Sequence, residues 1–297
     1  MFPPVTRLLC LLCLTLVTHA RAEITVTDDL GTPLKLPRAA QRIVSLAPHV
    51  TELIYAAGAG ERMVGAVDYS NHPPAALALP GVGSYTRVDL EAVAALRPDL
   101  IVGWRSGNLP AQIERLRALG IPVYVNESRD LAAVAHTLRQ IGRLAGTEAA
   151  ANDAAQRFEQ REAALRARYA GQMPVGVFYQ IWHQPLMTIN GKHLISDVIR
   201  LCGGHNAFDA LPLLAPKISV EAVLLANPET IVASGMSESR PEWLDAWRRW
   251  PQLDAVARDN LFFIPPDLIQ RHTPRILDGA QQLCEQLEAA RGRRAPR

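Results

Sequence analysis

Large aromatic and charged side chains stand where apolar segments of this 297-residue chain end. The segment LIVGW ends in Trp104 and is followed by Arg105. The segment MVGAVD is followed by Tyr69. Short apolar segments of this kind are typical of buried parallel strands, and open α/β sheets bind ligands at the carboxyl ends of their strands. Because aromatic rings offer large contact areas, we expect a ligand with a broad apolar face there.

Other candidate ligand groups occupy comparable positions after predicted strands. Tyr85 lies in the segment GVGSYTR, Trp182 and His183 follow VFYQI, and further polar groups follow LFFIPP. Each aromatic residue alone could be an ordinary core residue, but their shared position favours a cleft with aromatic walls and a few oriented polar groups. The predicted ligand-binding residues are Tyr69, Tyr85, Trp104, Met187, Asp267 and Arg271.

Motifs for catalysis or metal binding are weak. The chain has no Gly-x-Ser-x-Gly elbow, His-Glu-x-x-His motif or phosphate-binding Gly-Lys-Ser/Thr segment. His72, His183 and His272 could converge on a metal, although scattered histidines more often lie at the surface or cap helices. We therefore expect a binding protein and no enzyme, with no catalytic residue, no metal and no cofactor.

Strand and helix patterns alternate along the chain. Strands are predicted in RIVSLAP, MVGAVD, PDLIVGW and IPVYVN, and helices in TELIYAAGAG, VDLEAVAAL and LPAQIERLRALG. The segment ITVTDDLGTPLKL before them is typical of a hairpin. This order predicts a parallel sheet with helices on both faces.

A helical segment rich in Ala, Gln, Glu and Arg separates two such halves. Residues 147–169 predict one helix about 35 Å long at 1.5 Å per residue, and the segment lacks the Gly, Ser and Pro of a flexible hinge. We predict an N-terminal α/β lobe at 23–146, a linking helix at 147–170 and a C-terminal α/β lobe at 171–297. The fold class is thus α/β, with two parallel-sheet lobes joined by a rigid helix.

An internal similarity relates the two lobes. Residues 88–102, VDLEAVAALRPDLIV, and residues 218–232, ISVEAVLLANPETIV, share six of fifteen positions. Asp89 and Ser219 are suited to cap the two helices, which places Glu91 and Glu221 in the first turns. These acids could simply oppose the helix dipoles. Alternatively, matched acids on matched lobes could face a two-fold symmetric basic partner.

The N-terminus and the cysteines indicate export. Residues 1–22 contain the apolar run LLCLLCLTLV and end in Ala-Arg-Ala, which is typical of a cleavable signal peptide. Its removal takes away two of the 31 basic residues, so the remainder equals the 29 acidic residues, and nothing indicates nucleic-acid binding. Cys202 and Cys284 then remain, either as a disulfide or as two buried free thiols.

Several segments together resemble one known family. RIVSLAPHVTELIYAAG, VDYSNHPP, LEAVAALRPDLIVGWRSGN, LCGGHNAF and RHTPRILDGAQQLCEQL are similar to the periplasmic cobalamin-binding proteins of bacterial ABC importers, over about residues 40 to 290. Parts of the pattern also occur in the wider class of receptors for haem and siderophores. The resemblance implies a class III periplasmic binding protein, whose two α/β lobes are joined by one long helix and close only slightly on the ligand.

The resemblance also implies roles for particular residues. They are the cleft aromatics Tyr69, Tyr85 and Trp104, the polar clamp Asp267 and Arg271, the permease-docking glutamates Glu91 and Glu221, and a disulfide between Cys202 and Cys284. Three positions depart from the family pattern, because Tyr85 and Ala215 replace tryptophans and Met187 replaces a phenylalanine. These departures leave open which corrinoid is bound.

The function implied is capture of cobalamin or a related corrinoid in the periplasm. The expected partners are an inner-membrane ABC permease dimer with its ATPase, and the free protein is expected to be a monomer. An alternative is a receptor of the same fold for haem or a ferric siderophore, in which Tyr69 or Tyr85 ligates iron and Arg271 meets a propionate or catecholate. An enzyme acting on such a ligand is a third hypothesis.

Overall fold

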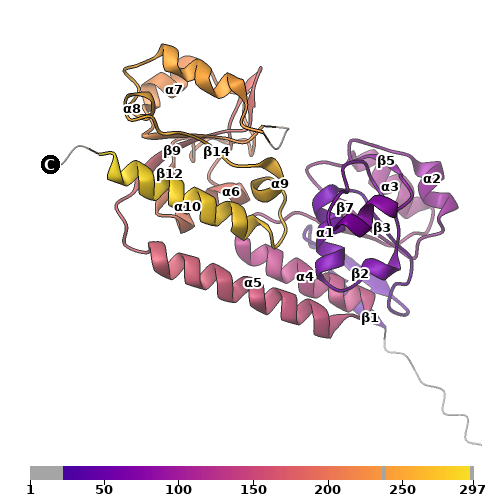
Figure 1. Cartoon of the computed structure of the whole chain (residues 1–297). Coiled ribbons are helices and arrows are strands. Elements are labelled where there is room, and N and C mark those ends of the chain that lie inside the picture. The colour runs from indigo at the N-terminus through magenta and orange to yellow at the C-terminus, as the bar shows by residue number, and fades with distance from the viewer. Residues whose placement is uncertain (1–22, 236–238, 295–297) are drawn as a thin grey trace, which may run out of the picture.

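Two α/β lobes stand side by side on a common helical base (Figure 1). The structure is a computed structural model and describes residues 23–235 and 239–294. Each lobe contains a four-stranded parallel sheet, in the order β4-β3-β7-β8 in the first and β12-β9-β13-β14 in the second. When the strands of each four-stranded sheet are numbered along the chain, both orders place the second strand at one edge, followed by the first, third and fourth. The two lobes therefore share one topology, as the internal similarity predicted.

The N-terminal lobe begins with the predicted hairpin, which is confirmed. Its strands are β1 (Ile24–Thr27), β2 (Pro33–Leu36), β3 (Ile43–Ser45), β4 (Met63–Ala66), β5 (Gly83–Ser84), β6 (Arg87–Val88), β7 (Leu100–Trp104) and β8 (Val123–Asn126). Its helices are α1 (Pro48–Ala56), η1 (Gly60–Arg62), η2 (Pro74–Ala78), α2 (Leu90–Ala95) and α3 (Pro110–Ala118).

The C-terminal lobe repeats this arrangement with a short hairpin after its first strand. Its strands are β9 (Val175–Gln180), β10 (Trp182–His183), β11 (Leu186–Met187), β12 (Gly204–Asn206), β13 (Thr230–Ala233) and β14 (Leu261–Phe263). Its helices are α6 (Leu194–Leu201), α7 (Val220–Ala226), η3 (Glu242–Arg249), α8 (Asp254–Ala257), α9 (Pro266–Ile269) and α10 (Ile276–Gly292).

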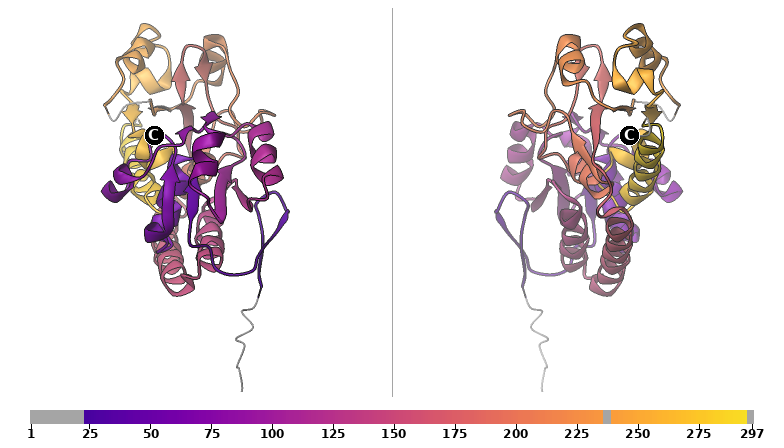
Figure 2. Two further views of the ribbon diagram at one scale, coloured as in Figure 1. Left: turned by 90° about the vertical axis from the view of Figure 1, so that its right-hand side faces the viewer. Right: turned by 90° about the vertical axis from the view of Figure 1, so that its left-hand side faces the viewer.

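A helical hairpin joins the lobes. Helix α4 (Leu131–Ala145) packs on the N-terminal lobe, turns at Gly146 and Thr147, and continues as α5 (Glu148–Tyr169), which is about 33 Å long. Figures 1 and 2 show the two helices side by side at the base of both lobes. They approach so closely that a Cβ atom at Gly142 would lie 2.3 Å from the Cβ of Ala151. The linking helix is therefore supported by α4 along its first part and by α10 further along, where Arg161 pairs with Asp278.

One apolar core runs through both lobes. It contains residues of α1, α4, α5, α6 and α10 together with the inner faces of both sheets, and two smaller clusters cover the outer faces. Helix α5 contributes one buried stripe, formed by Ala151, Ala155, Phe158, Leu165 and Tyr169. Because the shared core spans the base, the lobes are held together by packing as well as by chain connection.

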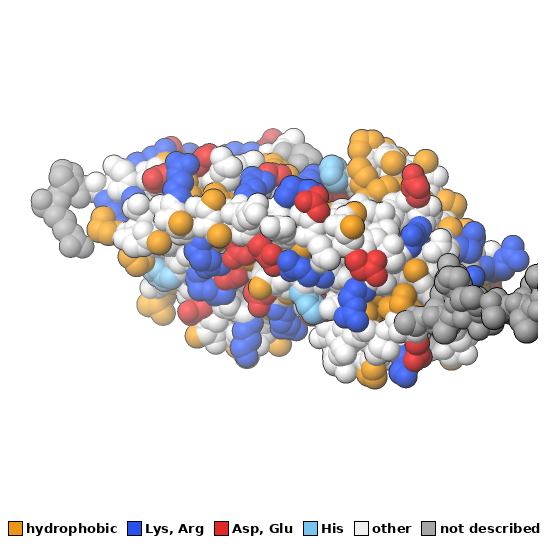
Figure 3. All heavy atoms as spheres, turned by 90° about the horizontal axis from the view of Figure 1, so that it is seen from below, with side chains coloured by type: hydrophobic (Ala, Val, Ile, Leu, Met, Phe, Trp, Pro, Cys, Tyr) orange, Lys and Arg blue, Asp and Glu red, His pale blue; other side chains and the backbone are white. Residues whose placement is uncertain are grey.

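The exposed side of α5 carries charges of both signs. Arg166 bonds to Glu162 at 2.7 Å, and Arg139 of α4 forms a bidentate pair with Glu159 at 2.6 and 2.8 Å. Seen from below, blue and red side chains alternate over this base (Figure 3). Charged residues cover most of the surface of α5, so the apolar pattern in its sequence is weak. The helix is nevertheless held to the core by its one buried stripe.

The predicted N-caps are confirmed. The Asp89 carboxylate accepts from the backbone N–H of Glu91 at 3.1 Å, and the Ser219 hydroxyl accepts from that of Ala222 at 3.2 Å. Glu91 and Glu221 therefore both lie exposed in the first turns of α2 and α7. Both helices lie on the side of the molecule away from α5 (Figure 1).

A disulfide between Cys202 and Cys284 fastens α6 to α10. Both residues are fully buried, and closing a loop of 82 residues stabilises a fold by about 4 to 5 kcal/mol in the chain-entropy model. The sequence left open whether the two cysteines form a disulfide or remain free thiols, and the structure has the disulfide.

The predicted signal peptide, residues 1–22, lies outside the described residues. Among the described helices, none combines the length and apolarity needed to cross a bilayer.

Candidate functional site

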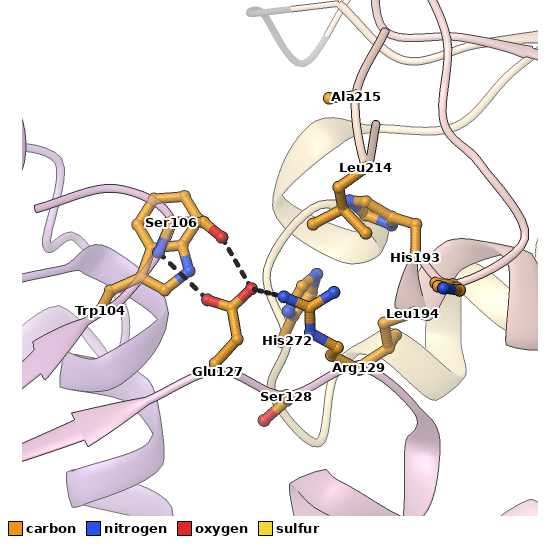
Figure 4. Close-up of a pocket in the computed structure, with 11 residues that line it drawn as sticks. Trp104, Ser106, Glu127, Ser128, Arg129, His193, Leu194, Leu214, Ala215 and His272 are labelled. Atoms are coloured by element: carbon orange, nitrogen blue, oxygen red, sulfur yellow. Dashed lines mark hydrogen bonds and ion pairs between the residues drawn. The ribbon is translucent and has the colours of Figure 1, made fainter. Parts of the chain in front are cut away.

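A cavity of about 220 Å³ opens between the lobes (Figure 4). The N-terminal lobe lines it with residues at the carboxyl ends of β7 and β8, and the C-terminal lobe lines it with loops before α6, before α7 and after α9. The lining residues are Trp104, Ser106, Glu127, Ser128, Arg129, Lys192, His193, Leu194, Leu214, Ala215 and His272. The cavity thus lies at the strand ends where the sequence predicted a ligand.

Trp104 is held in place by the loop that follows it. The Asn108 side chain accepts from the Trp104 N–H at 2.6 Å and donates to the carbonyl oxygens of Leu46 and Tyr85 at 2.9 and 2.8 Å. The indole ring lies over Gly107, where a Cβ atom would come within 1.9 Å of it. Its position therefore depends on a glycine and on a buried amide.

The aromatic wall continues on both sides of Trp104. The Tyr85 ring lies 5.7 Å from the indole between centroids, and His49 meets the indole edge-on at 5.0 Å. The structure thus brings Tyr85 and Trp104 together, as expected of two cleft aromatics. His49, on α1, extends this wall toward the C-terminal lobe.

A buried carboxylate ties the lobes to each other. Glu52 on α1 is 3% exposed and accepts hydrogen bonds from Arg271 at 2.7 Å and from Arg275 at 2.7 and 3.0 Å. Both arginines belong to the C-terminal lobe, more than 200 residues away in the chain. Two adjacent guanidinium groups compensate the charge of this buried carboxylate.

Arg271 is already engaged by four protein groups. Besides Glu52, its guanidinium contacts Asn71 Oδ1 at 2.7 Å, the Tyr69 carbonyl at 3.2 Å and Asp267 at 2.8 Å. Tyr69 itself has a left-handed φ of 64° and is 75% exposed. Three predicted site residues, Tyr69, Asp267 and Arg271, therefore meet in one bridge between the lobes.

Three histidine rings lie in a row, and two of them, His193 and His272, line the cavity. The centroid of His272 is 5.9 Å from that of His49 and 5.6 Å from that of His193. Burial lowers the pKa of His49 to about 4, and burial lowers the pKa of His193 and of His272 to about 3. All three rings are consequently neutral near pH 7.

Charged groups at the N-terminal side of the cavity are paired. Glu127 accepts from the Ser106 hydroxyl at 2.7 Å and from the Ser106 N–H at 3.1 Å, and it lies 3.4 Å from Arg129 (Figure 4). The Arg129 charge further lowers the pKa of His193. The cavity thus combines an apolar wall with neutral or compensated polar groups.

The metal site considered from the sequence does not form. His183 stacks on Trp243 at 5.3 Å in the C-terminal lobe, while His272 lies between His49 and His193. Within the described ranges, no three His, Cys, Asp or Glu residues are placed to hold a metal ion. The expectation that the histidines lie at the surface was also wrong for His49, which is 6% exposed. His193, in contrast, does cap a helix, because it accepts from the Ile195 N–H.

The remaining predicted positions lie in the C-terminal lobe. Met187 pairs with Trp182 in the β10–β11 hairpin and is half-buried, and it is outside the set of residues that line the cavity. Ala215 does line the cavity, so the small residue there leaves space at the wall. Arg105 is exposed beside Trp104.

Sequence reasoning missed several residues of the site. His49 follows the end of β3, the kind of position that identified Trp104, whereas His193 is the N-cap of α6 and does not follow a sheet strand directly. Asn108 had no such signal, because its role depends on the path of the loop. Glu52 also gave no signal, since its partners Arg271 and Arg275 are distant in the chain.

Comparison with known proteins identifies relatives of the whole chain. A family model described as periplasmic binding protein matches residues 43–268. The vitamin B12-binding protein of Vibrio cholerae serotype O1 is 36% identical over 258 residues, which cover 86% of this chain and 92% of that protein. The resemblance noted from the sequence is therefore confirmed.

Solved structures show the same architecture. The periplasmic vitamin B12 binding protein BtuF of Vibrio cholerae superimposes with a TM-score of 0.78 at 36% identity, covering 85% of this chain and 98% of that one. The periplasmic heme-binding protein RhuT from Roseiflexus sp. RS-1 superimposes with a TM-score of 0.72 at 23% identity, covering 85% and 100%. The second likeness concerns the fold alone. The predicted fold class is confirmed by both.

Replacement of Glu52 by Gln is expected to destabilise the protein by about 3 kcal/mol, because two partly buried guanidinium groups lose their shared, buried counter-charge. Glu159→Gln is the matched control, since it removes a charge from the exposed pair with Arg139 and should cost less than about 1 kcal/mol. Urea unfolding of both variants measures the difference. Equal effects would show that the buried pair contributes no more than a surface pair.

Acidification is expected to destabilise the protein through the three histidines whose rings lie in a row, His49, His193 and His272. Their folded pKa values of about 3 to 4 lie below the usual 6.5, so the unfolded chain binds more protons as the pH falls from about 6.5 toward 4. Each histidine contributes a slope of up to about 1.4 kcal/mol per pH unit in that window. Unfolding curves at pH 7.5, 5.5 and 4.5 measure the slope.

In the same series, His272→Phe should flatten the pH dependence of the unfolding free energy, whereas the exposed His136→Gln should leave it unchanged. A slope that His272→Phe does not alter would mean that other groups cause it.

Proposed function

The chain belongs to the family of periplasmic binding proteins, and we propose that it captures cobalamin or a related corrinoid in the periplasm and delivers it to an ABC importer. It performs no covalent chemistry and needs no cofactor. The corrinoid is its ligand, and an inner-membrane permease dimer with its ATPase is its partner. The free protein is a monomer in this proposal.

The observation that carries the proposal is the aromatic pair of Trp104, which lines the cavity between the lobes, and Tyr85 beside it, together with the neutral histidines of the cavity lining, His193 and His272. A corrin macrocycle is broad and apolar on its faces and carries neutral amide groups at its edge. The aromatic pair can pack against such a face, and the histidines offer hydrogen bonds without net charge. Relatives that are vitamin B12-binding proteins match this chain along most of its length.

The same geometry disfavours a haem ligand. A haem propionate needs an available cation when it is buried, because an unpaired buried charge is costly. Arg271, which the sequence offered for this role, already bonds to Glu52 and Asp267, and Arg129 lies beside Glu127. Tyr85, one of the two proposed iron ligands, packs against Trp104. A propionate at the rim could meet the exposed Lys192, whereas a propionate buried beside Arg271 or Arg129 would have to break an existing ion pair.

Glu91 and Glu221 are the proposed contacts with the permease. They are exposed, occupy equivalent positions on the two lobes and lie on the side away from α5. Hydrogen bonds from its own backbone N–H and from Ser219 lower the pKa of Glu221, so this carboxylate remains charged. Two matched negative charges suit a two-fold symmetric partner with basic residues.

Calorimetric titration of residues 23–297 with cyanocobalamin tests the proposal. Tight one-to-one binding is expected. Absence of binding to cyanocobalamin together with a Soret band in protein purified from haem-fed cells would replace the corrinoid by haem.

In the same titration, Trp104→Ala should weaken binding about 10- to 100-fold, as expected for loss of a buried aromatic anchor. Trp250→Ala is the matched control, because Trp250 packs on Trp247 in the outer cluster of the C-terminal lobe. Unchanged affinity of Trp104→Ala would remove this residue from the binding site.

Reversal of both docking charges, Glu91→Lys with Glu221→Lys, should leave cyanocobalamin affinity unchanged and abolish uptake by the importer. The control reverses two exposed acids, Glu61→Lys with Glu285→Lys, one on each lobe. Uptake of labelled cobalamin and titration of the same variants separate the two effects. Normal uptake by the docking variant would contradict the proposed contact.

A further inference from the structure

One carboxylate in the N-terminal hairpin holds the end of strand β8 through three hydrogen bonds. Asp29 lies in the turn between β1 and β2, and its Oδ1 atom accepts from the Tyr124 hydroxyl at 2.9 Å. Its Oδ2 atom accepts from the Asn126 side-chain amide at 2.9 Å and from the Glu127 N–H at 2.7 Å. The Asp29 N–H also donates to the Val125 carbonyl at 3.1 Å. The turn is thereby fastened to the part of β8 that leads into the cavity.

The turn that carries Asp29 is held by bonds of its own. The buried Asp28 carboxylate accepts from the N–H groups of Leu30 at 3.0 Å and Thr32 at 2.8 Å. The Asp28 carbonyl accepts from the Gly31 N–H at 2.9 Å, and Gly31 has a left-handed φ of 80°, which suits glycine. The Asp29 carboxylate is therefore presented to β8 from a well-supported turn.

The first connection from Asp29 to the cavity runs through Asn126. This amide is fully buried, and while its nitrogen donates to Asp29, its Oδ1 atom lies 3.1 Å from His49 Nε2. His49 in turn meets the Trp104 indole edge-on at 5.0 Å between ring centroids. The Asp29 bond thus fixes the amide that orients the ring beside Trp104.

The second connection runs through Glu127. Asp29 accepts from its N–H, and the Glu127 carboxylate accepts from the Ser106 hydroxyl at 2.7 Å and from the Ser106 N–H at 3.1 Å. Ser106 lies two residues after Trp104, in the loop that holds the indole. Both connections therefore end at Trp104 or at its loop, although Asp29 itself is outside the set of residues that line the cavity.

We propose that Asp29 is a positioning residue for Trp104: its carboxylate sets the orientation of the indole at the cavity and thereby the affinity for the ligand. For its effect on affinity, the inference rests on the proposed function. Hydrogen bonds to an ionised group are stronger than those between neutral groups, so a carboxylate suits this role. A binding residue that loses its supporting contacts spends only part of its time in the orientation that binds, and the apparent affinity falls by that fraction.

Asp99 offers a matched control in the same lobe. Its carboxylate accepts from the Gln41 N–H at 3.0 and 2.9 Å and from the Arg42 N–H at 2.8 Å, so it too ties an earlier segment to a strand of the sheet. Asp99 directly precedes β7, at the end of that strand opposite to Trp104. Loss of either carboxylate loosens the lobe, but the bonds of Asp29 lie at the cavity end of the sheet.

Calorimetric titration with cyanocobalamin at pH 7.5 tests the effect on affinity. Asp29→Ala should weaken binding about tenfold or more, since the indole loses the support of both connections. Asp29→Asn and Asp99→Ala should both stay within about threefold of the wild-type protein. The asparagine oxygen still accepts from Asn126 and Glu127, and its amide nitrogen can donate to the Tyr124 hydroxyl.

A double variant tests whether Asp29 acts through Trp104. In the Trp104→Ala background, Asp29→Ala should weaken binding by less than about threefold further, because two changes that act through one side chain are not additive. Should Asp29→Ala fail to fold, Asp29→Glu takes its place in every comparison. Glutamate keeps the charge but moves the carboxylate by one methylene, so the same loss of affinity is expected.

A second measurement needs no ligand. Protein labelled with fluorotryptophan gives one fluorine NMR signal for each of its five tryptophans, and the Trp104 signal is identified by its absence from Trp104→Phe. Asp29→Ala should shift or broaden the Trp104 signal and leave that of Trp247, in the outer cluster of the C-terminal lobe, in place. Asp29→Asn and Asp99→Ala should leave both signals in place.

Several results would overturn the inference. Asp29→Ala that binds as tightly as the wild-type protein, or an unmoved Trp104 signal in that variant, would show that Asp29 does not position the indole. An equal loss of affinity in Asp99→Ala would assign the effect to general loosening of the lobe, and full additivity with Trp104→Ala would assign it to another part of the site. Asp29→Asn as weak as Asp29→Ala would show that charge, and not bonding geometry, is what matters. Failure of cyanocobalamin to bind the wild-type protein would instead refute the proposed function, and the fluorine signals would still decide whether Asp29 positions Trp104.

Discussion

The relative position of the two lobes depends on the carboxylate of Glu52. It is buried on α1, and its charge is balanced by Arg271 and Arg275 from the opposite lobe. Without these partners an ionised carboxylate would not be stable at that depth. Arg271 also donates to the backbone carbonyl of Tyr69, so it joins the N-terminal lobe at a second point. A residue that the sequence suggested as a ligand clamp is therefore occupied in holding the protein together.

The ion pair acts together with a base that is difficult to deform. Helices α4 and α5 pack closely at Gly142, and the core that they share with α1, α6 and α10 runs under both lobes. Relative movement of the lobes must disturb either this core or the Glu52 pair. The arrangement favours a cleft whose shape exists before the ligand arrives, and a preformed cleft reduces the entropic cost of binding.

The sequence predicted those features that depend on local patterns. Strand ends identified Trp104 and Tyr85, internal similarity identified Glu91 and Glu221 with their caps, and the even cysteine pair proved to be a disulfide. Features that depend on long-range packing were not accessible in this way. The contact of Glu52 with Arg271 joins residues that are 219 positions apart, and the histidine row draws His49, His193 and His272 from three separate segments.

The disulfide sets the order in which the molecule can be completed during synthesis. All strands of the N-terminal sheet precede residue 127, so this sheet can assemble while the second half of the chain is still being made. Cys284 lies on the last helix, and it cannot meet Cys202 until nearly the whole chain has emerged. Arg271 and Arg275 emerge only shortly before it. Oxidation of the cysteine pair is accordingly among the last steps of maturation, and a chain that stops short of α10 would keep both partners of Glu52 but would lack the disulfide.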